Sequence, residues 1–247
     1  MNAVAIIQAR MGSVRLPGKI MTDLCGKPML WHIVKRVERS ELVNHVVIAT
    51  SKEQDGDAVE ELAEKNKFLL WRGSQNHVLK RFYDCAAHYK ADIVVRLTGD
   101  NALVDAGIID RGIAYFKECQ QDYIYYREGL PLGMAVEIFT YDALKCAYEN
   151  AADAQCFEHV TPYLYKNPQM FRAERVSCVG EDYSSLRWTM DTEQDKELIS
   201  EIYKNLYRES SYFSFEDILK EYEKHPEWKF INEQIEQKKV TYQGEED

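Results

Sequence analysis

The sequence lacks any apolar run long enough to cross a membrane. Its longest apolar stretches cover Ala3–Ile7 and His45–Ala49, whereas a helix that spans a bilayer needs about 20 consecutive apolar residues. The N-terminus also lacks the basic flank and the apolar segment that make up a signal peptide. These absences predict a cytoplasmic protein that has no membrane partner.

Cysteine is present but never in a pair with C-x-x-C spacing. The six cysteines are scattered over the chain, at positions 25, 85, 119, 146, 156 and 178. Such spacing does not describe a zinc site, and a chain of 247 residues is long enough to bury a core that needs no disulfides. We therefore expect reduced thiols, as in cytosolic proteins.

An excess of positive charge is also missing. The net charge is −10, which argues against general binding of nucleic acids because these require a basic surface. The charge is unevenly spread. Residues 1–40 hold seven Lys or Arg and two Asp or Glu, a local charge of +5, and the rest of the chain carries −15. A basic region within an acidic protein favours a small polyanion as the ligand.

Short apolar runs alternate with helical patterns in the first hundred residues. Continuous runs of five or six residues, rich in β-branched side chains, are predicted as buried parallel strands at Ala3–Gln8, His45–Thr50, Lys67–Trp71 and Asp92–Leu97. Amphipathic helices are predicted between them, and the first of these begins at Pro28. The alternation predicts an α/β fold, a Rossmann-like, open and mostly parallel sheet with helices on both faces.

The second half mixes strand and helix patterns, and no Pro-, Gly- or Ser-rich linker divides the chain. Strands are predicted over 123–126, 135–140 and 171–178, the last paired with 186–190, and helices over 141–150, 153–166, 193–208 and 215–225. The aromatic residues of 115–126 are interpreted as core packing, with a ligand pocket or an interface as the alternative. We predict one domain over 1–210 with an inserted β-rich lobe at about 120–180, then a helical appendage with a frayed acidic tail over 211–247.

A loop rich in Arg, Gly, Ser and Lys follows the first strand, which ends at Gln8. Its sequence over residues 9–19 is Ala-Arg-Met-Gly-Ser-Val-Arg-Leu-Pro-Gly-Lys. Ligands of open α/β sheets bind at the carboxyl ends of the strands, and glycines let backbone N–H groups turn towards an anion. Arg10, Arg15 and Lys19 add three cations. The loop is therefore predicted to bind the phosphates of a nucleoside triphosphate.

Two better-known phosphate loops are excluded. A Walker A loop has four residues between its glycines and a Ser or Thr after its lysine, whereas five residues separate Gly12 from Gly18 here and Ile20 follows Lys19. The G-x-G-x-x-G fingerprint of dinucleotide-binding folds is absent as well. An ordinary exposed basic loop is the remaining alternative to a phosphate-binding one.

Two aspartates are candidate magnesium ligands. Asp100 closes the motif Arg-Leu-Thr-Gly-Asp at the end of a predicted strand, and Asp191 lies within Arg-Trp-Thr-Met-Asp-Thr before a predicted helix. Mg²⁺ prefers hard oxygen ligands and commonly bridges one or two carboxylates to substrate phosphates. The alternatives are an ordinary Gly-Asp turn at Asp100 and a helix cap formed by Asp191 or Thr192.

The loop, together with the motif Gly-Lys-Pro-Met at 26–29, resembles the signature of the cytidylyltransferase family that includes 3-deoxy-manno-octulosonate cytidylyltransferase. It is most similar to the SpsF branch for spore coat polysaccharide biosynthesis, and the resemblance extends, more thinly, to about residue 205. It implies a Mg²⁺-dependent, homodimeric nucleotidyltransferase that transfers a nucleoside monophosphate from CTP to a sugar acid, a sugar phosphate or another small anionic acceptor. Pyrophosphate would be released, and the product would serve surface polysaccharide synthesis.

The resemblance also implies roles for individual residues. Arg10, Arg15 and Lys19 would be catalytic, and Asp100 and Asp191 would hold Mg²⁺. The residues implied to bind the nucleotide are Gln8, Ala9, Arg10, Gly12, Ser13, Lys19, Thr50, Ser51, Ser74, Arg81, Thr98 and Gly99. Those implied to bind the acceptor are Glu137, His159 and Arg187. For His159, a hydrogen-bonded and partly buried histidine is an equal alternative.

The chain departs from the SpsF pattern at three places. His77 stands where those proteins often have Asp, Asn101-Ala102 where they often have Cys-Pro, and Ala135 where they often have Asp. All three lie towards the base or the acceptor, so the resemblance implies retained phosphate chemistry and leaves the acceptor open. Two other functions remain as alternatives, a glycosyltransferase that uses a nucleotide sugar and a nucleotide-binding protein without catalysis. The Arg- and Lys-rich loop favours a triphosphate.

Overall fold

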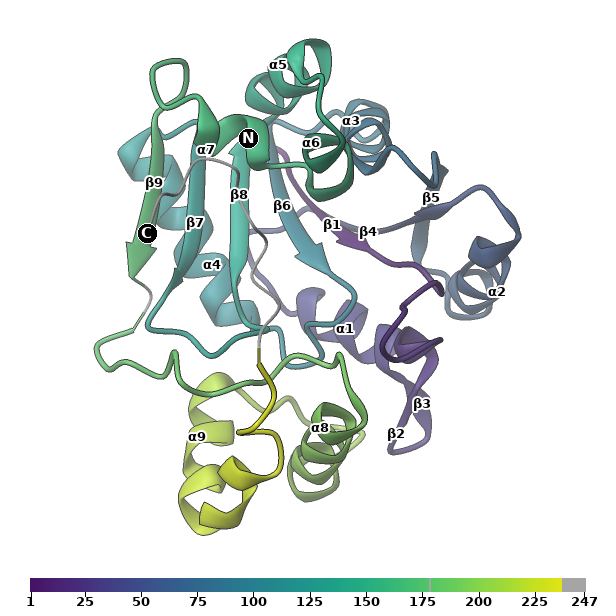
Figure 1. Ribbon diagram of the computed structural model, residues 1–247, viewed down its shortest axis with the longest axis vertical. Coiled ribbons are helices and arrows are strands. Elements are labelled where there is room, and N and C mark those ends of the chain that lie inside the picture. The colour runs from purple at the N-terminus through teal and green to yellow at the C-terminus, as the bar shows by residue number, and fades with distance from the viewer. Residues whose placement is uncertain (178, 237–247) are drawn as a thin grey trace.

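The computed structural model describes residues 1–177 and 179–236, and its centre is a seven-stranded sheet (Figure 1). The strands are β1 (Ala3–Gln8), β4 (His45–Ser51), β5 (Leu69–Gly73), β6 (Ile93–Thr98), β7 (Tyr123–Glu128), β8 (Val136–Thr140) and β9 (Ala173–Ser177). Their order across the sheet is β5-β4-β1-β6-β8-β7-β9. Neighbours pair in parallel except at β8, which is antiparallel to β6 and to β7. A separate small hairpin is formed by β2 (Asp23–Leu24) and β3 (Lys27–Pro28).

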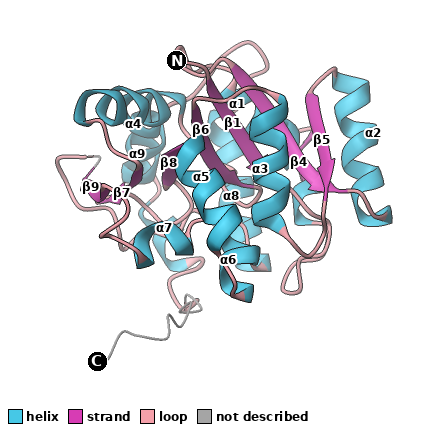
Figure 2. Ribbon diagram, turned by 90° about the horizontal axis from the view of Figure 1, so that it is seen from above, coloured by secondary structure: helices cyan, strands magenta, loops and turns pink. Residues whose placement is uncertain are grey.

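Helices cover both faces of the sheet (Figure 2). The α-helices are α1 (Met29–Val37), α2 (Asp57–Asn66), α3 (Val78–His88), α4 (Ala106–Cys119), α5 (Tyr141–Asn150), α6 (Ala154–His159), α7 (Pro162–Lys166), α8 (Glu193–Leu206) and α9 (Phe215–Lys224), and the short 3-10 helices are η1 (Lys19–Met21), η2 (Gln54–Gly56) and η3 (Pro226–Phe230). One core contains apolar side chains of α1, α2, α4, α8 and α9, and the other contains those of α3, α5 and α7. The predicted α/β fold is thus confirmed. No helix in the described ranges has the length and apolar character needed to cross a bilayer.

Apolar and polar residues do not alternate along the central strand β1, because both of its faces are buried. Ala3, Ala5 and Ile7 belong to one core, whereas Val4 and Ile6 belong to the other. All five are 0% exposed, as expected for a parallel strand that is covered on both faces. The two packed layers hold the carboxyl end of β1 in place, and the Arg-rich loop starts from that end.

The region expected to be a β-rich lobe contributes β7, β8 and β9, which extend the main sheet to its outer edge (Figure 1). The described part of the expected C-terminal appendage also joins the core. Phe213, Phe215, Ile218 and Trp228 are buried in the same cluster as α1 and α4. The predicted acidic tail and the last residue of the predicted strand 171–178 lie outside the described residues.

The elements differ from the predictions at four places. The helix predicted over 153–166 is two helices, α6 and α7, because the backbone at Val160 takes a φ of 72° and ends α6. The segment 186–190 forms no strand and makes only an isolated bridge, between Arg187 and Leu132. Helix α4 was not predicted, since its glycines at 107 and 112 are poor helix formers that weaken the pattern. Strand β5 starts two residues later than predicted.

Candidate active site

The carboxyl ends of β1 and β6 meet at one edge of the sheet because the two strands run in parallel. The backbone N–H of Gly99 donates to the carbonyl of Gln8 over 2.9 Å. A Cβ atom at position 99 would lie 2.9 Å from the same carbonyl oxygen, so glycine permits this close approach. The turn after β6 therefore brings Asp100 beside the loop that follows β1.

Lys19 joins the three sequence motifs. Its Nζ lies 2.7 Å from Oδ1 of Asp191 and 3.2 Å from Oδ2 of Asp100, although these aspartates are 172 and 81 residues away in the chain. The Lys19 side chain is only 11% exposed. A partly desolvated ammonium with two carboxylates interacts more strongly than a surface ion pair. The predicted loop and the predicted aspartates thus form one site.

The other two cations of the loop take different partners. Nη2 of Arg15 lies 3.0 Å from Oδ2 of Asp191, whereas Nη2 of Arg10 lies 3.5 Å from Oε1 of Glu158 on α6, with both side chains about half exposed. Arg15 therefore belongs to the Lys19 cluster. Arg10 faces the helices on the other side of the loop, where its guanidinium is accessible to a ligand.

Asp100 is held in its ionised form. Burial acts to raise the pKa of its carboxyl, but the charge of Lys19 and a hydrogen bond from Thr98 Oγ1 outweigh it, so the pKa is lowered. The Thr98 hydroxyl donates to Oδ1 of Asp100 over 2.5 Å. The carboxylate is therefore available at neutral pH both to Lys19 and to a metal ion.

The donor set fits Mg²⁺ better than a transition metal. Within residues 1–177 and 179–236, no three His, Cys, Asp or Glu side chains cluster as a metal site. Asp100 and Asp191 alone converge, and the ammonium of Lys19 lies at the point of convergence. Mg²⁺ commonly takes one or two carboxylates and completes its shell with water and phosphate oxygens. These two residues are thus suited to hold it.

Asp191 is supported by a buried network that the sequence analysis missed. Asp195 is 0% exposed, and its carboxylate accepts from Nε and Nη2 of Arg187 over 2.8 and 2.9 Å. It also accepts from the backbone N–H of Asp191 over 3.0 Å and from Nδ2 of Asn232 over 2.9 Å. Burial raises the pKa of the Asp195 carboxyl, but the hydrogen bonds from Arg187 and Asn232 outweigh it and lower the pKa.

The same network decides between the two interpretations of the motif at 187–192. Thr192 is the N-cap of α8, and Asp195 completes a capping box with it. The cap is therefore Thr192, which leaves the Asp191 side chain to Lys19 and Arg15. Arg187, expected to bind the acceptor, directs its guanidinium to Asp195 and, over 3.5 Å, to Oδ2 of Asp191. The sequence signal that would have identified the box is the T-x-x-D spacing of Thr192 and Asp195.

A second group of predicted residues lies at the carboxyl ends of β4 and β5. Thr50 and Ser51 are buried at the end of β4, and Arg81 on α3 is 1% exposed. Nη1 of Arg81 donates to the carbonyl of Ser74 over 2.7 Å, but its Nε and Nη2 and the hydroxyl of Thr50 are buried with no hydrogen-bond partner in the described structure. Buried polar atoms are rarely unsatisfied. These atoms therefore point to a ligand.

Burial lowers the pKa of the Arg81 guanidinium to about 10, and the charge of Arg10 contributes to the shift. Arg81 therefore lies near the Arg-rich loop that follows β1. His77, at one of the departures from the SpsF pattern, is the N-cap of α3, since its Nδ1 accepts from the backbone N–H of Lys80 over 3.0 Å. An Asp at this position would be an equally good cap.

The residues expected to contact the acceptor lie near β8. Glu137 forms an ion pair with Arg96 and accepts hydrogen bonds from the hydroxyls of Tyr123 and Thr161 over 2.8 and 2.7 Å. His159 is the last residue of α6, and burial, with the charges of Arg96 and Arg10, lowers its pKa. His159 is therefore mostly neutral at pH 7. The Arg96–Glu137 pair lies close to it, since the charges of both residues act on this pKa.

A profile of the cytidylyltransferase family matches residues 4–246 of the chain. The chain is a member of that family. An uncharacterized protein of Methanocaldococcus jannaschii is 33% identical over 241 residues, 96% of this chain and 97% of that protein. Spore coat polysaccharide biosynthesis protein SpsF of Bacillus subtilis is 35% identical over 205 residues, 81% of this chain and 85% of that protein.

A solved structure of a cytidylyltransferase from Leptospira borgpetersenii is similar over almost the whole length. It is 32% identical, with a TM-score of 0.88, and the match covers 96% of this chain and 100% of that one. Membership of the cytidylyltransferase family confirms the resemblance noted in the sequence. It also makes the protein a nucleotidyltransferase.

Proposed function

We propose that this cytidylyltransferase transfers CMP from CTP to a small anionic, sugar-like acceptor and releases pyrophosphate, for the synthesis of a surface polysaccharide precursor. The observation that carries the proposal is the position of Lys19 between Asp100 and Asp191. It combines a cation for phosphate oxygens with two carboxylates that suit Mg²⁺. The proposal includes a homodimer in the cytoplasm, supported by the family resemblance.

The reaction is an in-line displacement. An acceptor oxygen, which if it belongs to a hydroxyl gives its proton to water, attacks the α-phosphorus, the bond to the bridging oxygen breaks, and pyrophosphate leaves with the electron pair. Lys19 and Arg10 stabilise the charge that develops on the leaving group, and Arg15 holds Asp191 in place. The backbone N–H of Gly12 and the hydroxyl of Ser13 donate to phosphate oxygens, since the N–H of Ser13 is bonded to the carbonyl of Met11 over 2.9 Å. Asp100 and Asp191 would hold Mg²⁺, which would supply charge neutralisation and orientation of the phosphates.

The free donors of Arg81 fit cytosine better than uracil. The Nε and Nη2 atoms without partners are two N–H donors in the fixed fork of a guanidinium. Cytosine presents two neighbouring acceptors, O2 and N3, whereas N3 of uracil carries a hydrogen and is a donor. A buried donor that faces a donor has no hydrogen bond, which costs about 1–3 kcal/mol. This difference supports CTP as the nucleotide.

Thermal unfolding in the presence of nucleotides tests the function. The chain is heated with CTP, UTP, ATP or GTP, each with and without Mg²⁺. We expect CTP with Mg²⁺ to raise the melting temperature most, because a ligand that binds the native state stabilises it. Release of pyrophosphate from CTP in the presence of acidic sugars then tests turnover. Release of a nucleoside diphosphate from a nucleotide sugar, with no shift by any triphosphate, would instead establish the glycosyltransferase alternative.

Replacement of Arg81 with methionine is expected to change the affinity for CTP much more than the free energy of unfolding. We expect CTP to bind at least tenfold more weakly, since two hydrogen bonds to the base are lost, and the preference for CTP over UTP to disappear. The free energy of unfolding should change by less than about 1 kcal/mol, because loss of the bond to Ser74 is offset by removal of a desolvated charge. Calorimetric titration and urea denaturation measure the two effects. Arg39→Met, at an exposed position after α1, is the control, and equal loss of binding in both variants would contradict the role of Arg81.

A further inference from the structure

A cavity of about 470 Å³ lies beside α1, between this helix and the part of the chain that ends α8 and leads to α9 (Figure 1). Its lining comes from residues 27–39 and 203–213. The two segments are in contact, since the ring centres of His32 and Tyr203 lie 4.6 Å apart. The volume is within the range of roughly 300–1,000 Å³ that is typical of sites for small molecules. The residues assigned above to CTP, Mg²⁺ and the acceptor all lie outside this lining.

Arg36, in the wall of this cavity, is a buried cation that has no carboxylate partner within residues 1–177 and 179–236. It is 5% exposed, and arginine is seldom buried to this extent unless it is paired. Its Nε donates to the carbonyl of Val104 over 2.7 Å. Its Nη2 donates to the carbonyls of Leu103 and Phe213 over 3.5 and 3.1 Å. These bonds fix the orientation of the guanidinium and leave its charge uncompensated.

The remaining nitrogen of the guanidinium, Nη1, provides two further N–H donors. They have no hydrogen-bond partner in the described part of the chain, and Nη1 is not among the polar atoms there that are closed off from solvent. Because Arg36 lines the cavity, we assign these donors to the cavity. The bonds to the three carbonyls hold them in place before a ligand arrives, which lowers the entropic cost of binding. A fixed pair of donors on a cation is suited to a phosphate or a carboxylate.

The charges around Arg36 also favour an anion. The lining contains four basic and two acidic side chains, which are Lys27, Lys35, Arg36, Arg39, Glu38 and Glu209. Nζ of Lys35 pairs with Oε2 of Glu38 over 2.7 Å, which leaves three cations and Glu209. His32 adds no charge at neutral pH, because burial lowers its pKa to about 4. The cavity therefore has a local charge of +2, in a chain whose net charge is −10.

Aromatic rings make up most of the remaining lining. They belong to Trp31, Tyr203, Tyr207, Tyr212 and Phe213. Cζ of Arg36 lies 4.8 and 4.3 Å from the ring centres of Tyr212 and Phe213, so the anion-binding group and the rings are adjacent. Trp31 and Tyr207 are only partly buried, which leaves part of each ring accessible. Aromatic side chains pack well against another planar ring, and a ligand that uses both features is a ring with an anionic group.

We propose that this cavity binds a planar aromatic anion, a ring that carries a phosphate or a carboxylate. The anionic group accepts hydrogen bonds from Nη1 of Arg36 and is attracted by Arg39, and the ring packs against Trp31 and Tyr207. The site goes beyond the proposed function and does not depend on it, because the cavity shares no lining residue with the CTP site proposed above.

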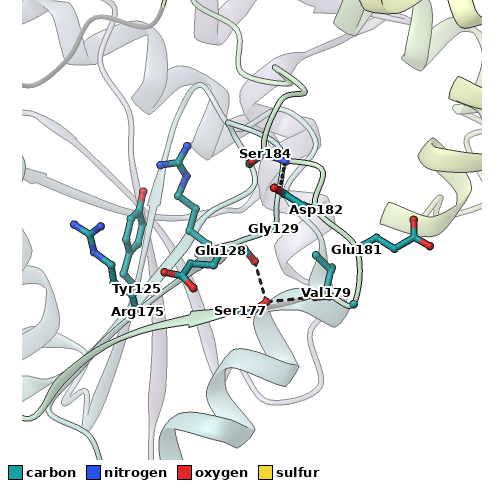
Figure 3. Close-up of a pocket in the computed structure, with 11 residues that line it drawn as sticks. Tyr125, Glu128, Gly129, Arg175, Ser177, Val179, Glu181, Asp182 and Ser184 are labelled. Atoms are coloured by element: carbon teal, nitrogen blue, oxygen red, sulfur yellow. Dashed lines mark hydrogen bonds between the residues drawn. The ribbon is translucent and has the colours of Figure 1, made fainter.

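A second cavity, of about 580 Å³ at the carboxyl ends of β7 and β9, provides a comparison. Its charged side chains are two arginines and three carboxylates, namely Arg127, Arg175, Glu128, Glu181 and Asp182. Arg175 is exposed, and Figure 3 shows it beside Tyr125. A lining with more carboxylates than cations does not favour an anion. Arg175 is therefore a matched control for Arg39, which is also an exposed arginine in the lining of a cavity.

The test measures binding of phenyl phosphate, benzoate, inorganic phosphate and phenol to the full chain by calorimetry. We expect phenyl phosphate or benzoate to bind at least fivefold more tightly than inorganic phosphate and phenol, because only an aromatic anion uses both the rings and the cations. The stronger of the two distinguishes a phosphate site from a carboxylate site. The indole N–H signal of Trp31 in NMR spectra, assigned with Trp31→Phe, should shift when that probe binds.

Arg39→Glu should reduce the affinity for the aromatic anion at least fivefold, whereas Arg175→Glu, the same change of charge, should leave it within twofold. Arg36→Lys removes the fixed donors and should also cost at least fivefold. If that variant fails to fold, Arg39→Glu still decides, since position 39 is exposed. Equal losses in Arg39→Glu and Arg175→Glu would overturn the proposal, as would inorganic phosphate that binds as tightly as phenyl phosphate and benzoate. Loss of the probe in Lys19→Ala but not in Arg39→Glu would place the anion in the Arg-rich loop and also overturn it.

Discussion

Replacement of Lys19 with alanine is expected to reduce kcat at saturating CTP by at least about a hundredfold, the loss observed when one donor to a developing negative charge is removed. Two effects combine in this variant. The leaving pyrophosphate loses a cation, and Asp100 and Asp191 lose the ammonium that lies 3.2 and 2.7 Å from them. The two carboxylates then repel each other, so the pKa of Asp100 should rise towards its ordinary value.

The measurement is steady-state release of pyrophosphate at saturating CTP, with circular dichroism to show that the variant is folded. Lys35→Ala is the control, because Lys35 on α1 pairs with the exposed Glu38 that follows the helix, away from the site. We expect it to retain full activity. Unchanged turnover in Lys19→Ala would refute the proposed role of the loop.

The sequence was sufficient to predict which segments come together around Lys19. The loop from Gln8 to Lys19, Asp100 and Asp191 were each found from local motifs at the ends of predicted elements, and parallel pairing of strands brings such ends together. The assignment of Thr192 as the cap of α8 also follows from local spacing, the T-x-x-D of a capping box. Local sequence patterns are thus enough to predict site residues that lie at the ends of strands and helices.

The supporting residues could not be predicted in the same way. Asn232 bonds to Asp195, 37 residues away, and to the carbonyl of Arg187, 45 residues away, and no local pattern relates these positions. The register of β7 against β9 is likewise set by pairing between distant segments. The break between α6 and α7 depends on the positive φ of Val160, a conformation that a β-branched residue rarely adopts.

Asp195→Ala is expected to lower the free energy of unfolding by about 3–5 kcal/mol, because removal of one partner from a buried ion pair leaves the other charge uncompensated. The side chains of Arg187 and Asp195 are 8% and 0% exposed. The same substitution removes the hydrogen bond to the backbone of Asp191. We therefore expect kcat to fall as well, since the Asp191 carboxylate, which we propose as a metal ligand, loses its fixed position.

Asp217→Ala provides a matched control. Asp217 has the same place in the capping box of α9 that Asp195 has in α8, but it is 46% exposed and has no buried arginine as its partner. Its loss should cost about 1 kcal/mol, as expected for a cap alone. Urea denaturation of both variants measures the difference. Equal losses would show that Asp195 acts only as a cap.

The ion pair of Asp195 can be identified as the cause of the stability loss in Asp195→Ala from the pH dependence of that loss. The pKa of Asp195 is lowered from its ordinary value of 3.8, so the ionised carboxylate stabilises the fold at all pH values above about 4. As the pH falls below 3.8 towards the lower pKa of the folded state, the unfolded chain takes up the proton first and the contribution is lost. The gap in stability between wild type and Asp195→Ala should therefore be constant from pH 5 to 8 and narrow below about pH 4. A gap that stays constant into the acid range would mean that packing, not charge, holds Asp191 in place.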